Sequence, residues 1–239
     1  MKHDATTNYV FLPMERPVVP IVGSDELFPV HRIFCVGRNY AEHAKEMGVE
    51  VDRESPFYFM KPASAIAVAP ATTAYPPGTK NFHYEMELVV ALGGHAFNIA
   101  AAKATDVIFG YACGLDMTRR DLQLEARAKG RPWDTGKAVE QSAVISPIAR
   151  KESFGAIGDQ AITLALNGVT KQSARLSDLV WSVPEILAHL STLYHLRPGD
   201  LIYTGTPAGV GPVAPGDHLI GRIDGLPDVE LTIGPREGT

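Results

Sequence analysis

Two glutamates and an aspartate are the residues of this sequence whose types and spacing best suit chemistry. Glu85 and Glu87 lie two residues apart in a segment, residues 82–90, that alternates polar with apolar side chains. Strand alternation places His83 and both carboxylates on one face, with the glutamates roughly 7 Å apart and no lysine or arginine on that face. A shared cation would turn their repulsion into binding energy. An isolated pair also fits a strand whose polar face meets water.

Asp116 provides a third carboxylate, because it ends the apolar run 108–115 directly before a predicted helix. Functional sites are often built at such junctions. Helix capping or a turn is the alternative role for Asp116, but Thr118 is the better candidate for the cap. Three oxygen ligands without cysteine favour a hard divalent cation, Mg²⁺ or Mn²⁺ ahead of Ca²⁺, and disfavour zinc.

The elements that must position these carboxylates are mainly strands. Short apolar segments recur between Pro and Gly turns, at residues 9–12, 18–22, 33–36, 57–60, 65–68, 85–92, 162–166, 201–203 and 229–233. Val, Ile, Tyr and Phe enrichment with such punctuation predicts strands. Helical patterns are fewer, at residues 39–48, 100–107, 118–129 and 183–193, the third opening with the capping-box-like spacing Thr118 to Asp121. The sequence therefore predicts a β-rich α+β fold.

Composition predicts an ordinary globular protein. The chain has 239 residues, of which 45% are hydrophobic and 21% charged. This length fits one domain at residues 26–239, with the Pro-spaced residues 1–25 as a short extension packed on it. The net charge of −5 comes without a long basic run, so nucleic acid is not an expected partner.

No signal-peptide core or apolar membrane span is evident, which predicts a cytoplasmic protein with no membrane partner. Cys35 and Cys113 lie in apolar runs and are expected to be buried thiols rather than nucleophiles.

Six ordered blocks of the sequence resemble the fumarylacetoacetate hydrolase family. They are IFCVGRNYAEH (33–43), FMKP (59–62), HYEME (83–87), GYACGLDMTRRDLQ (110–123), PWDTGK (132–137) and YTGTPAGVG (203–211). The resemblance implies a mixed β-sandwich roll with a few short peripheral helices, a homodimer, and Mg²⁺ or Mn²⁺ held by Glu85, Glu87 and Asp116. GRPWDTGK (130–137) and the amino-terminal extension are most similar to members that cleave fumarylpyruvate in gentisate breakdown.

The resemblance also implies roles that spacing alone does not assign. His43 and Glu46, on one side of a predicted helix, match a catalytic pair, and Lys137 matches an active-site lysine. Without the resemblance, His43 is one of eight histidines and Lys137 an ordinary loop lysine. Substrate binding is implied for Arg38, Arg120, Gln123, Thr204, Gly205 and Thr206. Many relatives have a small residue at the position of Arg119, and close relatives often have an aromatic residue at the position of Val139.

The implied activity is hydrolysis of a carbon–carbon bond in an acylpyruvate, a 2,4-dioxo acid. The expected reaction converts 3-fumarylpyruvate to fumarate and pyruvate, with Arg119 or Arg120 on the far carboxylate. An alternative outcome at the same metal site is decarboxylation of oxaloacetate, general acylpyruvase activity, or isomerisation of an unsaturated oxo acid. A further alternative is a non-catalytic, carboxylate-rich module that binds Ca²⁺ for structural reasons.

Overall fold

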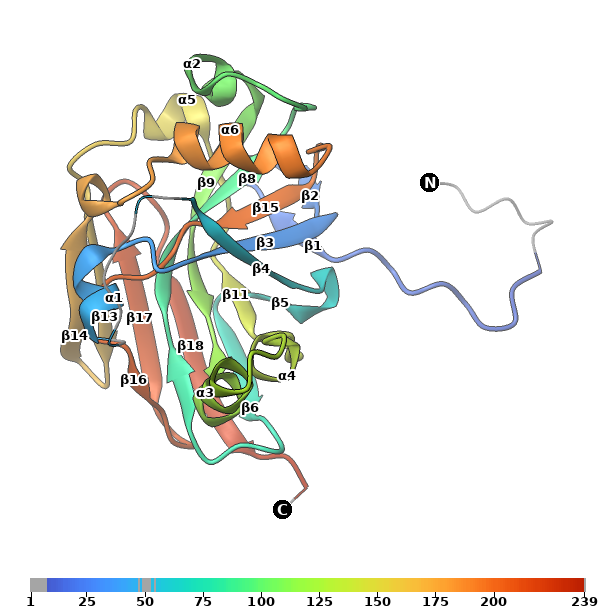
Figure 1. The fold of residues 1–239 in the computed structure, drawn as a ribbon. Coiled ribbons are helices and arrows are strands. Elements are labelled where there is room, and N and C mark those ends of the chain that lie inside the picture. Colours follow the sequence, from blue (N-terminus) through green and yellow to red (C-terminus); the bar gives the residue numbers. More distant parts are fainter. Residues whose placement is uncertain (1–7, 47, 49–52, 54, 239) are drawn as a thin grey trace.

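The computed structural model describes residues 8–46, 48, 53 and 55–238. Strands dominate these residues, and the short helices lie around the sheets (Figure 1). The β-rich α+β class predicted from the sequence is confirmed. Residues 1–7 of the predicted extension lie outside the described residues. Within the described part of the chain, no helix is both long and apolar enough to cross a lipid bilayer.

The largest sheet carries the strands that end at the site. It has eight strands: β4 (Phe57–Lys61), β3 (Arg32–Gly37), β15 (Asp200–Tyr203), β8 (Met86–Leu92), β9 (Ile108–Asp116), β11 (Ala143–Ile145) and β5 (Ile66–Val68) in that order, with β12 (Ala149–Arg150) beside β9. Every residue of β8 is buried, because the sheet is covered on both faces. Leu88 and Val90 belong to one hydrophobic core, whereas Val89 and Ala91 belong to a second one.

A five-stranded sheet faces the largest one across the first of these cores. Its order is β14 (Val169–Arg175), β13 (Ala161–Leu166), β17 (His218–Ile223), β18 (Val229–Arg236) and β6 (Ala71–Tyr75). Leu164, Leu219 and Leu231 pack in the same cluster as Leu88. The two sheets therefore form a sandwich with its layers joined by side-chain packing.

Two small sheets complete the strands. One pairs β1 (Val18–Pro20) with β2 (Leu27–Pro29) and covers the second core with Val19 and Phe28. The other joins β10 (Thr118–Arg119), β7 (Phe82–Tyr84) and β16 (Gly211–Pro212). The β7 strand brings the segment of Glu85 next to the segment that follows Asp116.

The helices are short and peripheral. They are α1 (Ala41–Glu46), α2 (Ala101–Ala104), α3 (Arg120–Ala128), α4 (Asp134–Lys137), α5 (Lys151–Phe154) and α6 (Val183–Leu193), with 3-10 turns η1 (Ala63–Ala65), η2 (Thr105–Val107) and η3 (Leu176–Asp178). The bounds of α6 are the predicted ones, because Ser182 and Glu185 form a capping box and a proline occupies the first turn.

The predicted strand at 9–12 and the predicted helices at 39–48, 100–107 and 118–129 differ from the structure. The helix predicted at 100–107 is α2 followed by the 3-10 turn η2. Residues 9–12 form no strand, and their side chains are exposed. The helix predicted from Thr118 begins at Arg120. Thr118 belongs instead to strand β10, where it pairs with His83 of β7, and its hydroxyl donates to the carbonyl of Asp116. The helix predicted at 39–48 is α1 alone, and residue 47 of that range lies outside the described residues.

Candidate active site

Three carboxylates meet where β8 and β9 lie side by side. Glu85 lies between β7 and β8, Glu87 is in β8, and Asp116 is the last residue of β9. The amide of Asp116 donates to the carbonyl of Glu85 at 2.9 Å, which fixes the two segments together. One oxygen from each carboxylate lies within 4.8 Å of the others. The exposed fractions are 5% for Glu85, 1% for Glu87 and 0% for Asp116, so the alternative of a water-facing strand is wrong.

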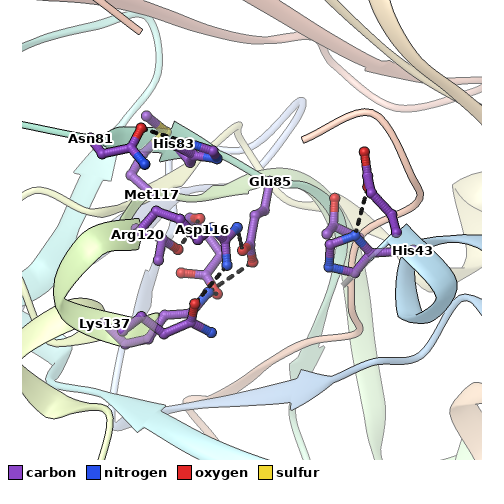
Figure 2. Close-up of polar contacts among 12 residues, drawn as sticks. His43, Asn81, His83, Glu85, Asp116, Met117, Arg120 and Lys137 are labelled. Carbon is purple, nitrogen blue, oxygen red and sulfur yellow. Dashed lines mark hydrogen bonds and ion pairs between the residues drawn. The ribbon is translucent and has the colours of Figure 1, made fainter. Parts of the chain in front are cut away.

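Two cations from other elements compensate these carboxylates. The Lys137 Nζ atom, at the end of α4, donates to Glu85 Oε2 at 2.8 Å and to Asp116 Oδ2 at 2.7 Å. Arg120, at the start of α3, donates to Glu85 Oε1 and, at 2.8 Å, to Gln123 Oε1. Figure 2 shows Lys137 and Arg120 converging on Glu85. The strand itself supplies no cation, as predicted, but the tertiary fold supplies two.

A third buried cation, Lys61, was not assigned a role from the sequence. Its Nζ atom donates to the carbonyls of Met117 at 3.0 Å and Lys137 at 2.6 Å, and to Ser142 Oγ at 2.8 Å. It also forms an ion pair with Asp116 Oδ1 at 2.9 Å. Asp116 Oδ1 is thus buried beside the charge of Lys61, and no described residue gives it a well-aligned hydrogen bond.

The electrostatics of the cluster are uneven. Burial and the charges of Asp116 and Glu85 raise the pKa of Glu87 well above its usual range. Burial opposes ionisation of Glu85 too, yet Lys137 and Arg120 outweigh it and lower the pKa of that carboxyl. Burial disfavours the charged form of Lys137, but Asp116 and Glu85 outweigh it and raise the pKa of the ammonium group. Positive charge is thus well placed for Glu85 and insufficient for Glu87.

These residues fit a hard divalent cation. All three candidate ligand groups are carboxylates, which Mg²⁺ and Mn²⁺ prefer. Asp116 Oδ1 accepts no well-aligned hydrogen bond from a described residue and has only the charge of Lys61 beside it, whereas buried polar atoms are normally hydrogen-bonded. A cation shared with Glu87 would pair this atom and offset the repulsion between the anions.

His43 and Glu46 lie together on α1, at the edge of the same site. The Nδ1 atom of His43 is 3.2 Å from Glu46 Oε2, which also accepts from the amide of Gly209 at 3.2 Å. In Figure 2, Glu85 lies between His43 and Lys137. The exposed fraction of His43 is 7%, so it is not one of the surface histidines.

Asn39 connects α1 to the loop that follows β15. Its side chain donates to the carbonyls of Thr204 at 2.8 Å and Trp181 at 3.0 Å, and accepts from the amide of Trp181 at 2.7 Å. The amide of Gly205 in turn donates to Glu87 Oε2 at 2.7 Å. Gly205 has φ +100°, and a Cβ atom there would lie 2.7 Å from the Asn39 Cβ, so glycine is required.

One cavity opens onto this cluster. Its lining contains eight of the residues singled out from the sequence: Arg38, His43, Glu85, Glu87, Arg120, Gln123, Lys137 and Thr206. Asp116, Glu46 and Gly205 are not in the lining but contact residues that are. Thr204 is also outside the lining, and its hydroxyl donates to the carbonyl of Leu88. The lining also contains residues to which sequence reasoning gave no role, namely Val36, Gly37, Phe59, Arg127 and Trp133.

Other candidates lie away from the cavity. Arg119 and Val139 do not line it. Both cysteines are buried, as predicted; burial raises the pKa of Cys113 to about 12 and that of Cys35 well above its usual range. Neither thiol is therefore suited to nucleophilic attack.

Comparison with known proteins identifies the family. Residues 32–234 match the family model described as fumarylacetoacetate (FAA) hydrolase C-terminal. The chain belongs to the fumarylacetoacetate hydrolase family.

Three individual relatives are similar to most of the chain. The chain is 55% identical over 194 residues to a fumarylpyruvate hydrolase of Ralstonia sp, which covers 80% of this chain and 100% of the relative. A crystal structure of fumarylpyruvate hydrolase from Pseudomonas aeruginosa, in complex with Mn²⁺ and pyruvate, matches with a TM-score of 0.93 and 46% identity, over 96% of this chain and 100% of that one. A mitochondrial oxaloacetate tautomerase of Mus musculus is 39% identical over 84% of this chain and 90% of its own.

Proposed function

We propose that this protein is a metal-dependent hydrolase that cleaves 3-fumarylpyruvate to fumarate and pyruvate. The observation that carries the proposal is the one cavity that Glu85, Glu87 and His43 line together, with Glu46 on the Nδ1 atom of His43. The relative from Ralstonia supports the choice of fumarylpyruvate. The Mn²⁺ and pyruvate bound in the Pseudomonas structure support the choice of a metal and a pyruvyl group.

Glu85, Glu87 and Asp116 would hold Mg²⁺ or Mn²⁺, with Ca²⁺ as a weaker candidate. When bound, the cation supplies Lewis-acid polarisation and a template for the pyruvyl oxygens. Lys137 holds Glu85 and Asp116 in place, and the amide of Gly205 does the same for Glu87. The ligand set is therefore positioned by hydrogen bonds from two other segments.

His43 would act as the general base. With Glu46 on its Nδ1 atom, the imidazole presents Nε2 to a water molecule and takes one of its protons. The water oxygen then bonds to the distal carbonyl carbon of the substrate. The carbon–carbon bond breaks with its electron pair on the pyruvyl side, and the proton held by His43 returns to that carbon. Glu46 is itself held by the Gly209 amide, which fixes the orientation of the pair.

Lys137 and Arg120 would stabilise the negative charge that develops on the pyruvyl half. Lys137 stays protonated, because Asp116 and Glu85 raise its pKa. Both cations line the cavity and are already oriented by Glu85. Fixed positive charge in a buried site stabilises a transition state without reorganisation. Gln123 and Thr206 line the same cavity and are proposed to bind substrate oxygens.

Isomerisation or decarboxylation of an oxo acid is the second candidate. The similarity to an oxaloacetate tautomerase of Mus musculus favours it, since the same cluster would stabilise an enolate derived from oxaloacetate. Shared folds host different reactions, so the products must decide. The homodimer, the cytoplasmic location, the gentisate pathway and the division into residues 1–25 and 26–239 all remain predictions from the sequence.

A parallel assay distinguishes the reactions. The Mn²⁺-loaded protein is given fumarylpyruvate, acetylpyruvate and oxaloacetate separately, and products are identified by NMR. We expect equimolar fumarate and pyruvate from fumarylpyruvate at the highest rate. Consumption of oxaloacetate with fumarylpyruvate left intact would overturn the proposal. A structural Ca²⁺ module would instead give no turnover and a thermal shift with Ca²⁺ but little with Mg²⁺ or Mn²⁺.

A further inference from the structure

Gln172 is the one buried residue of β14, a strand at the edge of the five-stranded sheet. The other residues of this strand are exposed or half-buried. The Oε1 atom of Gln172 accepts from the amide of Met86 at 3.0 Å. The Nε2 atom donates to Thr206 Oγ1 and to the carbonyl of Pro207, each at 2.8 Å. Glutamine is seldom fully buried, and this one joins the second sheet to two segments of the candidate active site.

The hydrogen bonds of Gln172 fix which way its amide group points. A backbone amide can only donate, and a backbone carbonyl can only accept. The side-chain oxygen must therefore face Met86 and the NH2 group must face Pro207, because a flipped amide would oppose donor to donor and acceptor to acceptor. The second proton of the NH2 group then points to Thr206 Oγ1. The Thr206 hydroxyl accepts in this contact, so its own proton is left to donate elsewhere.

We propose that Gln172 is a positioning residue that makes the Thr206 hydroxyl a hydrogen-bond donor to an anionic oxygen of the ligand. This inference rests on the proposed function, in which Thr206 binds a substrate oxygen. Thr206 lines the cavity, and no described residue accepts its hydroxyl proton. A carboxylate or enolate oxygen offers only lone pairs and needs such a donor. A hydroxyl that donated to its own neighbour would present lone pairs to the ligand and disfavour it.

Thr204, two residues earlier, has the opposite arrangement. Its hydroxyl donates to the carbonyl of Leu88 at 3.0 Å, so its proton is already used. Between the two threonines, the amide of Gly205 donates to Glu87 Oε2 at 2.7 Å. Thr206 therefore lies at the end of the cavity where Glu87 lies, and the ligand oxygens within its reach are those of the pyruvyl end.

The loop that carries Thr206 is also held against β14 by its backbone. Gly209 has φ +96°, and a Cβ atom at this position would collide with the carbonyl oxygen of Lys171. The loop thus passes directly over the residue next to Gln172. The amide of Gly209 also donates to Glu46 Oε2 at 3.2 Å. Close packing of the two main chains keeps Thr206 within reach of the Gln172 side chain.

A double-mutant cycle of Gln172→Glu and Thr206→Val tests the positioning role. In Gln172→Glu the new carboxylate still accepts from Met86 but cannot donate, so the Thr206 proton turns towards it. We expect kcat/KM for fumarylpyruvate to fall by about 10- to 100-fold, the usual worth of a hydrogen bond to a charged group. Thr206→Val, which lacks the hydroxyl, should lower it by about the same factor. In the Thr206→Val background, Gln172→Glu should cost about threefold or less, because the group through which it acts is gone.

The cycle separates the hydroxyl from other effects of the substitution. The added charge and any change in packing are present in both backgrounds, so an equal cost of Gln172→Glu in both would overturn the proposal. Where Gln172→Glu does not fold, Gln172→Met is similar in size, lacks the donor, and is taken through the same cycle with the same expectation.

Gln160→Glu is the matched control. Gln160 also accepts from a backbone amide, that of Gly158, and donates to a backbone carbonyl, that of Ala156, but it lies outside the cavity lining. Its kcat/KM should equal that of wild type. A loss as large as that in Gln172→Glu would show that the effect does not depend on Thr206.

Binding of oxalate separates failure of this role from failure of the proposed function. Oxalate mimics the pyruvyl end and needs no turnover, and calorimetry with Mn²⁺ gives its Kd on the four proteins of the cycle. We expect Gln172→Glu to raise this Kd about 10-fold or more in wild type but about threefold or less with Thr206→Val. That pattern in a protein that does not cleave fumarylpyruvate keeps the role of Gln172 and rejects the reaction. A Kd that changes by the same factor in both backgrounds, in a protein that cleaves fumarylpyruvate, rejects the role and keeps the reaction.

Discussion

Buried carboxylates lie near both ends of the parallel strands β3 and β15, but their hydrogen bonding differs. At the starting end, Asp200 accepts from His31 Nδ1 at 2.8 Å, from Arg32 Nε at 3.0 Å and NH2 at 2.7 Å, and from the amide of Arg197 at 2.9 Å. At the other end, three carboxylates crowd together, and Asp116 Oδ1 has no hydrogen bond from a described residue.

We interpret the cluster around Asp200 as structural and the cluster around Glu87 as the proposed metal site. Asp200 is fully buried, but both of its oxygens are satisfied, so nothing further is needed there. The cluster around Glu87 is equally buried, and its cations pair with Glu85 and Asp116, so burial and the neighbouring carboxylates still raise the pKa of Glu87. A buried group left incomplete is costly, which points to a ligand that completes it. Substitutions in either cluster, and addition of metal, test this difference.

Glu87→Gln should have the largest effect on activity. We expect a loss of about a thousandfold or more in kcat, since metal polarisation contributes several kcal/mol to catalysis. The fold should persist, because the change removes one of three mutually repelling anions. Turnover assays with Mn²⁺ and a thermal melt of the metal-free protein measure the two effects. Activity near that of wild type would show that Glu87 is not a ligand.

Asp200→Ala should have the opposite effects, a large loss of stability and little loss of activity. Removal of this buried partner leaves Arg32 without its carboxylate, and breaking such a pair costs about 3 kcal/mol or more. Denaturant unfolding measures the loss. Assays well below the melting temperature should give a kcat close to that of wild type, because the cluster lies at the end of the sheet remote from the cavity. A loss of kcat in the folded variant would contradict the division between the two ends.

Mn²⁺ should stabilise the folded protein only when the cluster of Glu85, Glu87 and Asp116 is intact. At a free Mn²⁺ concentration of 100 times its Kd, we expect the free energy of unfolding to rise by about 2.7 kcal/mol. Differential scanning calorimetry should show the increase in wild type and Asp200→Ala but not in Glu87→Gln. An equal increase in all three proteins would place the ion elsewhere.

His31→Ala should have the smallest effect. His31 is partly exposed and supplies one of several hydrogen bonds to Asp200, so its loss should cost about 1 kcal/mol. Urea unfolding alongside Asp200→Ala measures the difference. A cost as large as that of Asp200→Ala would mean that Arg32 alone does not satisfy the buried carboxylate.

The sequence predicts the clustering of the three carboxylates well because local rules determine it. Alternation places Glu85 and Glu87 together, and Asp116 is found from its position after an apolar strand. His43 and Lys137 could not be distinguished from surface residues by spacing, and only the family resemblance pointed to them. The α6 helix follows from its capping box, whereas Thr118 was misread as a cap because its ladder partner, His83, lies far away in the sequence.

Tertiary contacts explain what was missed. Lys61 is fully buried because carbonyls from two other segments surround its ammonium group, and lysine is seldom buried in this way. Gln172 appears in the sequence as one polar residue of a strand that is mostly exposed. Its contact with Thr206 depends on the fold, because the two residues are 34 positions apart in the sequence.

Anomalous diffraction from crystals grown with Mn²⁺ and oxalate is the most direct test of the central claim. The account predicts one manganese peak bonded to an oxygen from each of Glu85, Glu87 and Asp116, with Oδ1 as the Asp116 ligand and oxalate completing the coordination. A peak that lacks any of these carboxylates, or a site that stays empty while Lys137 still bridges Glu85 and Asp116, would contradict it.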